Sequence, residues 1–94
     1  MTYVNLHMID ERILELRQKI DNIDEEIIHL LKKRMEVSKN AGLLKAELHI
    51  PVEDKKREKE IIHRLGELAN GNLKEEQLLR IFSAVFKSSK QIQK

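Results

Sequence analysis

Arg34 and Lys45 are the residues of this sequence whose type and spacing most suggest chemistry. Arg34 stands in a run of apolar residues that recur every three or four positions, where a guanidinium group is costly unless it is paired. Lys45 follows three helical turns later, which in a helix puts the two residues about 16 Å apart and about 20° apart around the axis. Two long cations on one helix face could bind a small dianion between them. The alternative interpretation makes Arg34 a residue that sets helix register and Lys45 a lysine favoured near a helix C-terminus.

Two polar residues near the C-terminus are further candidates. Ser89 and Gln93 are four positions apart, on the helix face that Phe82 and Phe86 begin. Convergent polar groups at the end of an apolar stripe are typical of a ligand pocket, although a fraying helix end would give the same pattern.

A charged segment follows the single proline and contains Asp54, Arg57 and Glu58. Asp54 and Glu58 share a helix face, and such charges most often form a solvated surface. Ser88 and Ser89 have no histidine near them in the sequence, and the chain contains neither a glycine-rich phosphate loop nor an H-E-x-x-H motif. An enzyme with these residues would work by positioning and electrostatics.

The composition excludes several classes of site. The chain has no cysteine, and its histidines stand singly, so we expect no metal site. The net charge is +2 and basic residues alternate with acidic ones, which argues against nucleic-acid binding. Neither a secretory leader nor a membrane span is evident, so we expect a cytoplasmic protein that does not bind membranes. The 94 residues suit one domain, with residues 1–8 as a flexible lead.

The elements that must position these residues are helices. A seam of apolar residues with heptad spacing predicts one long helix over residues 9–47, with Arg34 set into the seam. The seam consists of Ile13, Leu16, Ile20, Ile23, Ile27, Leu30, Val37, Ala41 and Leu44. Such a helix is roughly 58 Å long, so it must pack against another chain along much of its length.

Two shorter helices complete the predicted fold, which is all-α. Residues 49–52 interrupt the pattern at Pro51, and a second helix is expected over residues 54–69 with Asp54 as its N-cap. Gly71 suits a left-handed helix end, and Asn72 with Glu75 resembles a capping box for a third helix. The apolar face of that third helix carries Leu78, Ile81, Phe82, Val85, Phe86 and Ile92.

Two sequence blocks make the chain similar to the all-α chorismate mutases. The first is L-R-x-K-I-D-x-I-D-x-x-I-x-x-L-L-x-x-R over residues 16–34, and the second is P-V-x-D-x-x-R-E over residues 51–58. The resemblance extends over residues 16–93. It implies three helices, one very long, in an intertwined homodimer with shared active sites. It also implies a cofactor-free isomerase that converts chorismate to prephenate in phenylalanine and tyrosine biosynthesis.

The resemblance also assigns a role toward the substrate to each candidate residue. By this resemblance, Arg17 reaches a substrate carboxylate in the partner chain's site, and Arg34 binds a carboxylate in its own. Lys45 contacts the ether oxygen and a carboxylate, and Ser89 lies near a carboxylate. Gln93 donates to the ether oxygen, with Gln91 as the alternative.

The segment after the proline completes the implied site. Asp54, Arg57 and Glu58 match positions near the substrate hydroxyl, with Glu58 as its acceptor. The chain departs from the family pattern in its longer N-terminal lead and in Phe86, where an aliphatic residue is common.

The spacing of the two arginines bears on the dimer. Arg17 and Arg34 are about 25 Å apart along one helix and about 100° apart around it, so one chain cannot bring both to one small molecule. If both are functional, the long helices must pair antiparallel. Three rival functions stay open: an isochorismate-pyruvate lyase of the same fold, a non-catalytic helical dimerisation or regulatory module, and a helical DNA-binding module.

Overall fold

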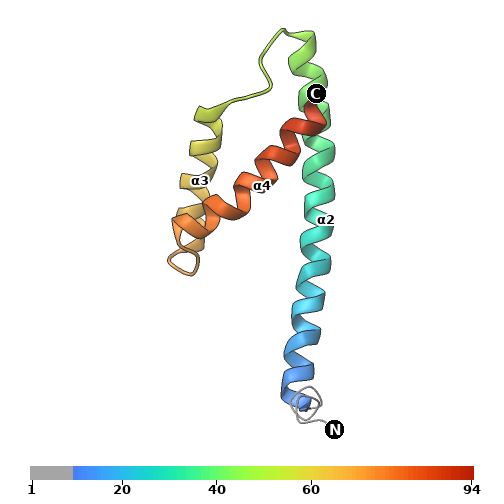
Figure 1. Cartoon of the computed structure of the whole chain (residues 1–94), viewed down its shortest axis with the longest axis vertical. Helices are drawn as coiled ribbons and strands as arrows, with labels where there is room; N and C mark the ends of the chain where they lie inside the picture. The colour runs from blue at the N-terminus through green and yellow to red at the C-terminus, as the bar shows by residue number, and fades with distance from the viewer. Residues whose placement is uncertain (1–9) are drawn as a thin grey trace. The chain divides into compact units, whose positions relative to one another are not determined.

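The structure is a computed structural model that describes residues 10–94, and within that range it contains three helices and no strand (Figure 1). They are α2 (Glu11–Glu47), α3 (Lys55–Ala69) and α4 (Glu75–Gln93). The prediction of an all-α chain with one long helix is confirmed. The expected lead at residues 1–8 lies outside the described residues, as does the expected first residue of the long helix. Over residues 10–94, no helix is long and apolar enough to cross a membrane.

The helix ends follow local chemistry. α2 ends shortly before Pro51, where His49 adopts a left-handed conformation with φ of 59°. Asp54 is the N-cap of α3, as predicted, because its Oδ1 accepts a hydrogen bond from the Arg57 backbone nitrogen at 2.9 Å. α3 ends in two left-handed residues, Asn70 and Gly71.

The predicted cap of the third helix is wrong. α4 begins at Glu75, so Lys74 rather than Asn72 occupies the N-cap position. Its backbone nitrogen donates to Gln77 Oε1 at 2.8 Å. Glu75 is the first helical residue and therefore cannot reach back as the third residue of a capping box does, whereas Gln77 can.

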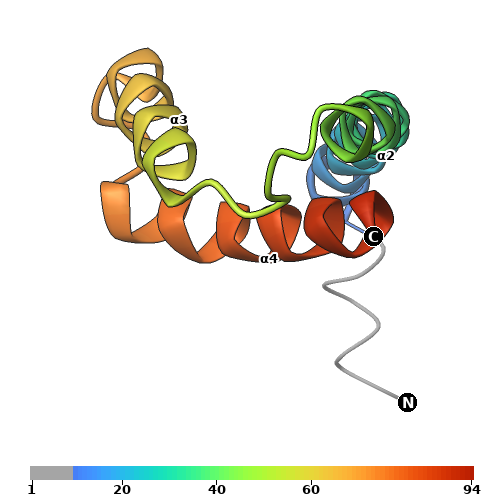
Figure 2. The same cartoon turned by 90° about the horizontal axis from the view of Figure 1, so that it is seen from above.

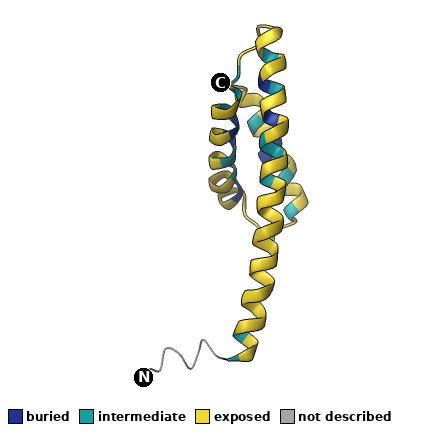
Figure 3. Cartoon of the chain, turned by 90° about the vertical axis from the view of Figure 1, so that its right-hand side faces the viewer, coloured by how far each residue is buried: buried dark blue, intermediate teal, exposed yellow. Residues whose placement is uncertain are grey.

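The described chain divides into two compact units between Lys33 and Arg34. In the first unit, α2 carries the apolar seam on an exposed surface, and five seam residues are between 47% and 62% exposed (Figure 3). These five are Leu16, Ile20, Ile23, Ile27 and Leu30. No residue between 10 and 33 is buried.

The core lies in the second unit, between α3 and α4. Ile61 and Ile62 of α3 pack with Phe86 of α4, and Leu65 and Phe82 are partly buried against them. The rings of Phe82 and Phe86 lie 5.9 Å apart between centroids in a tilted arrangement. α4 continues from this core to the C-terminal part of α2, so one helix connects two packing partners (Figure 2).

α4 meets α2 at Gly42, which is buried, as is Ser38 one turn earlier. A Cβ added to Gly42 would lie 2.7 Å from the Cα of Gln93. The two backbones therefore approach more closely than any other residue at position 42 would allow.

Candidate active site

Arg34 and Ser89 form the first polar pair of the site. Arg34 Nη1 donates to Ser89 Oγ at 2.6 Å, and the hydroxyl in turn lies 3.8 Å from Met35 Sδ. The guanidinium also lies over the Phe86 ring, 5.8 Å from its centroid. Arg34 is half-buried while Ser89 is buried. A charged donor is thus fixed by a neutral hydroxyl and a ring face, which leaves its charge uncompensated by either contact.

Lys45 and Gln93 form the second pair. Lys45 Nζ donates to Gln93 Oε1 at 3.0 Å and to the Val52 carbonyl oxygen at 3.2 Å. Both partners are neutral, so neither contact offsets the positive charge of Lys45. Between the two amides proposed from the sequence, Gln93 reaches Lys45, while Gln91 is exposed. The structure therefore brings Arg34, Lys45, Ser89 and Gln93 together where α4 meets α2.

The three candidate residues after the proline make different contacts. The Asp54 carboxylate caps α3, and Arg57 is exposed on the first turn. Glu58 is half-buried, and its Oε2 lies 3.3 Å from Lys90 Nζ of α4. Lys90 also donates to Glu53 Oε1 at 3.2 Å.

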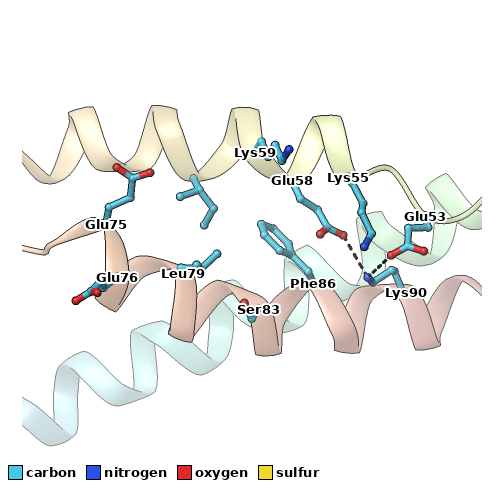
Figure 4. Close-up of a pocket in the computed structure, with 11 residues that line it drawn as sticks. Glu53, Lys55, Glu58, Lys59, Glu75, Glu76, Leu79, Ser83, Phe86 and Lys90 are labelled. Atoms are coloured by element: carbon cyan, nitrogen blue, oxygen red, sulfur yellow. Dashed lines mark hydrogen bonds and ion pairs between the residues drawn. The ribbon is translucent and has the colours of Figure 1, made fainter.

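A cleft of about 800 Å³ lies between α3 and α4 in the same unit (Figure 4). Glu58, Phe86 and Lys90 lie toward one end of the cleft, and Glu75 and Glu76 lie at the other. Arg34 and Lys45 do not line this cleft, but Phe86 lines it and also faces Arg34. The carboxylates of Glu75 and Glu76 would repel an anionic ligand at their end of the cleft.

Lys90 interacts with two of the carboxylates that line the cleft. Its hydrogen bonds to Glu53 and then Glu58 raise the pKa of Lys90 above its usual value. The same hydrogen bond from Lys90, helped by its charge and that of Lys55, lowers the pKa of Glu53. Lys90 is therefore a cation that two carboxylates neutralise, in contrast to Arg34 and Lys45.

This arrangement suits an anionic ligand whose reaction needs fixed donors. Within the described residues, Arg34 and Lys45 supply two positive charges, and Gln93 supplies an amide that does not titrate. No serine at this site contacts a histidine that could activate it, since Ser89 contacts Arg34 and Met35. The geometry favours electrostatic stabilisation rather than covalent or acid–base catalysis.

Comparison with known proteins decides the family. The family model of type II chorismate mutases matches residues 16–94. The chain belongs to the type II chorismate mutase family. This confirms the resemblance that the two sequence blocks suggested.

Individual relatives agree with the family assignment. The chain is 34% identical to the chorismate mutase of Methanocaldococcus jannaschii over 89% of its own length and 86% of that protein. It is 32% identical to the bifunctional chorismate mutase/prephenate dehydratase of Aquifex aeolicus, covering 89% of this chain and 24% of that longer protein. The solved structure of a chorismate mutase from Thermus thermophilus matches with a TM-score of 0.83 and 33% identity, over 87% of this chain and 93% of that one.

Arg17 is the candidate that the chorismate mutase resemblance places outside the chain's own site. It lies on the exposed surface of α2 in the first compact unit. Arg34, Lys45, Asp54, Arg57, Glu58, Ser89 and Gln93 all lie in the second unit.

Two residues next to the candidate site residues were missed by sequence reasoning. Gly42 was unremarked, because a glycine inside a helix costs about 1 kcal/mol whether or not it makes a close contact, and Gly66 shows the same pattern with nothing near it. Lys90 was also missed, because a lysine beside Ser89 resembles an ordinary surface residue until Glu58 is placed opposite it. A search for cations next to predicted site residues would have found it.

Proposed function

We propose that this protein converts chorismate to prephenate. The match of the type II chorismate mutase model over residues 16–94 carries this proposal. The pairing of Arg34 with Ser89 and of Lys45 with Gln93 supports it, because these residues are the ones that the family resemblance assigns to the substrate's carboxylates and ether oxygen.

The reaction is an intramolecular rearrangement in which the ether C–O bond breaks while a C–C bond forms. No proton moves and no redox step occurs, so side chains suffice. Arg34 binds one carboxylate and favours the compact conformer that brings the reacting carbons together. As the C–O bond breaks, negative charge collects on the ether oxygen. Lys45 and Gln93 donate to that oxygen and stabilise the transition state more than the substrate.

The orientation of Gln93 fits this role. Its Oε1 accepts from Lys45, which leaves the amide nitrogen, with two N–H donors, for the substrate. Glu58 accepts a hydrogen bond from the substrate hydroxyl, with Asp54 and Arg57 near it at the start of α3. The ring of Phe86 excludes water beside Arg34 and so strengthens its contacts with substrate.

We further propose a homodimer, in which residues 1–94 of each chain act as one domain. The seam of α2 supports it, because large apolar side chains such as Leu16, Ile23 and Leu30 are more than half exposed in a single chain. Arg17 and Arg34 are seventeen positions apart on one continuous helix. Antiparallel pairing of two such helices brings Arg17 of each chain to the site of the other and gives two equivalent sites.

The decisive experiment follows chorismate loss with the purified protein and identifies the product by chromatography. We expect prephenate to accumulate in proportion to the chorismate consumed. Isochorismate is assayed in parallel, and release of pyruvate without prephenate formation would establish the lyase instead. A stable dimer that consumes neither substrate would make the chain a non-catalytic dimerisation module. Loss of prephenate formation in Arg34→Ala, with the helical spectrum retained, excludes a contaminating enzyme.

A further inference from the structure

The contacts of Lys90 suggest a role that the family resemblance does not assign. Its ammonium group lies 3.3 Å from Glu58 Oε2 and 3.2 Å from Glu53 Oε1 (Figure 4). The Lys90 side chain is 31% exposed and that of Glu58 is 27% exposed. The pair therefore lies inside the wall of the cleft rather than on an open helix surface, where ion pairs contribute little.

The three charges form an asymmetric group. Glu53 precedes α3, Glu58 lies in its first turn, and Lys90 comes from the last turns of α4. Glu53 is more exposed than Glu58 and holds the lysine from its outer side. Because both carboxylates bind the same ammonium group, the Lys90 side chain has one favoured position, and that position fixes where the Glu58 carboxylate lies.

We propose that Lys90 is a positioning residue that holds the Glu58 carboxylate toward the substrate hydroxyl. This inference rests on the proposed function for the identity of the substrate. Glu58 has three rotatable side-chain bonds, and a free carboxylate in the cleft would sample several rotamers. Lys90 restricts it before substrate arrives, so the hydrogen bond to the hydroxyl costs less ordering entropy.

Lys90 also offsets charge. Without it, Glu53 and Glu58 would present two negative charges to a substrate that carries two carboxylates. With it, the three charges sum to a single net negative charge, and the Glu53 side chain is 54% exposed, so solvent screens part of that charge. The lysine therefore allows a carboxylate acceptor to stand beside an anionic ligand.

A double-mutant cycle tests the inference. Lys90→Met keeps the length of the side chain and removes the charge, and Glu58→Gln removes the carboxylate. We expect Lys90→Met to lower kcat/KM for chorismate about tenfold in the parent, and by less than about twofold in the Glu58→Gln background, because the two residues act as one unit. Lys90→Arg keeps a cation and is expected to recover most of the activity. Lys87→Met, an exposed lysine one turn earlier on α4, is the matched control and should change little.

Other outcomes overturn the inference. Equal losses for Lys90→Met with and without Glu58 would mean that Lys90 binds substrate directly. If the Lys90→Met enzyme is as active as the Lys87→Met enzyme, Lys90 is a surface residue that does not contribute to activity.

A crystal structure of Lys90→Met provides a readout that needs no turnover. The Glu58 carboxylate is expected to leave its place in the cleft or to lose its density. A Glu58 side chain that keeps the same rotamer contradicts the inference even if activity falls. If the parent protein does not consume chorismate, the proposed function fails, while this structure still decides whether Lys90 positions Glu58.

Discussion

The two parts of α2 carry the same exposed seam of apolar residues but differ in what their other residues contact. Up to Lys33, seam residues such as Ile20 and Ile23 are about half exposed, and none of the described residues is buried. Beyond Lys33, the seam residues Val37 and Leu44 are still 67% and 53% exposed, whereas Ser38 and Gly42 are buried and Arg34 is half-buried against Phe86. The seam therefore stays exposed in both parts, and only the second part also has small and polar residues that its own chain buries.

The comparison teaches that α4 covers one face of α2 while the apolar seam stays exposed on both sides of Lys33. Where α4 crosses it, α2 has Gly42, so that the two backbones approach and donors converge. Along the seam, α2 has large exposed aliphatic residues, which suit a helix of the same kind in another chain. The predictions below test this division, from the largest expected effect to the smallest.

The two arginines test whether the first part of α2 works only across chains. Arg17→Ala and Arg34→Ala should each lower activity by about 10³-fold, since each removes a charged donor from both sites of the proposed dimer. Mixing the two variants under conditions of chain exchange should restore about one quarter of parental activity, because half of the dimers are mixed and each has one intact site. Mass-tagged chains verify the exchange. No recovery after confirmed exchange would contradict the crossed-helix proposal.

Lys45 tests the second part of α2, where the chain supplies its own site. Lys45→Ala should keep the helical circular-dichroism spectrum and lose about 10²–10³ in kcat, because it removes a preorganised donor to developing negative charge. Lys39→Ala removes the same group from an exposed position on the same helix and should retain activity. If the activity of Lys45→Ala is within about threefold of that of the parent, Lys45 does not belong to the site.

The glycines test how closely α4 must approach α2. Gly42→Ala puts a Cβ 2.7 Å from Gln93 Cα, so the end of α4 must shift. We expect a loss of about 1–3 kcal/mol in the free energy of unfolding and a fall in kcat as Gln93 moves away from Lys45. Gly66→Ala is the matched control, because nothing lies within 4 Å of its added Cβ, and it should raise stability by up to about 1 kcal/mol. Urea titrations measure both, and equal stabilities for the two variants would show that the helices do not meet at Gly42.

The smallest expected effect is a change in the titration of Glu53. Lys90 lowers the pKa of Glu53, so the pair contributes stability above the ordinary value near 4.5 and loses it as pH falls through the lowered value. Lys90→Met should raise the pKa of Glu53, which carboxyl-carbon NMR follows residue by residue. Asp10, whose pKa is lowered by hydrogen bonds from Arg12, is an internal control in the other unit and should not move. An unchanged Glu53 titration would mean that the Lys90 contacts do not persist in solution.

Much of the fold was predictable because it depends on local pattern. The heptad seam predicted α2 almost to its ends, since apolar periodicity and the interruption at Pro51 are properties of adjacent residues. The Asp54 cap was predictable for the same reason, as its carboxylate contacts a backbone nitrogen three residues away. The cap of α4 was not, because a capping box at Asn72 and a cap at Lys74 differ only by where the turn ends.

The site was partly predictable. The types of Arg34, Lys45, Ser89 and Gln93 marked them as candidates, and the spacing of Ser89 and Gln93 placed those two on one helix face. Their pairing as Arg34 with Ser89 and Lys45 with Gln93 depends on the crossing of two helices that are more than forty residues apart in the chain. No local pattern contains that crossing.

By itself, the sequence determined which residues are helical, which helix face is apolar and, through its resemblance to a family, which chemistry to expect. Only the tertiary structure decided that Gly42 lets Gln93 approach Lys45 and that Lys90 stands opposite Glu58. The physical reason is how far apart in the sequence the interacting residues lie. Helix formation and capping depend on neighbours within four residues, whereas the contacts of a site depend on the angle and register at which separate helices pack.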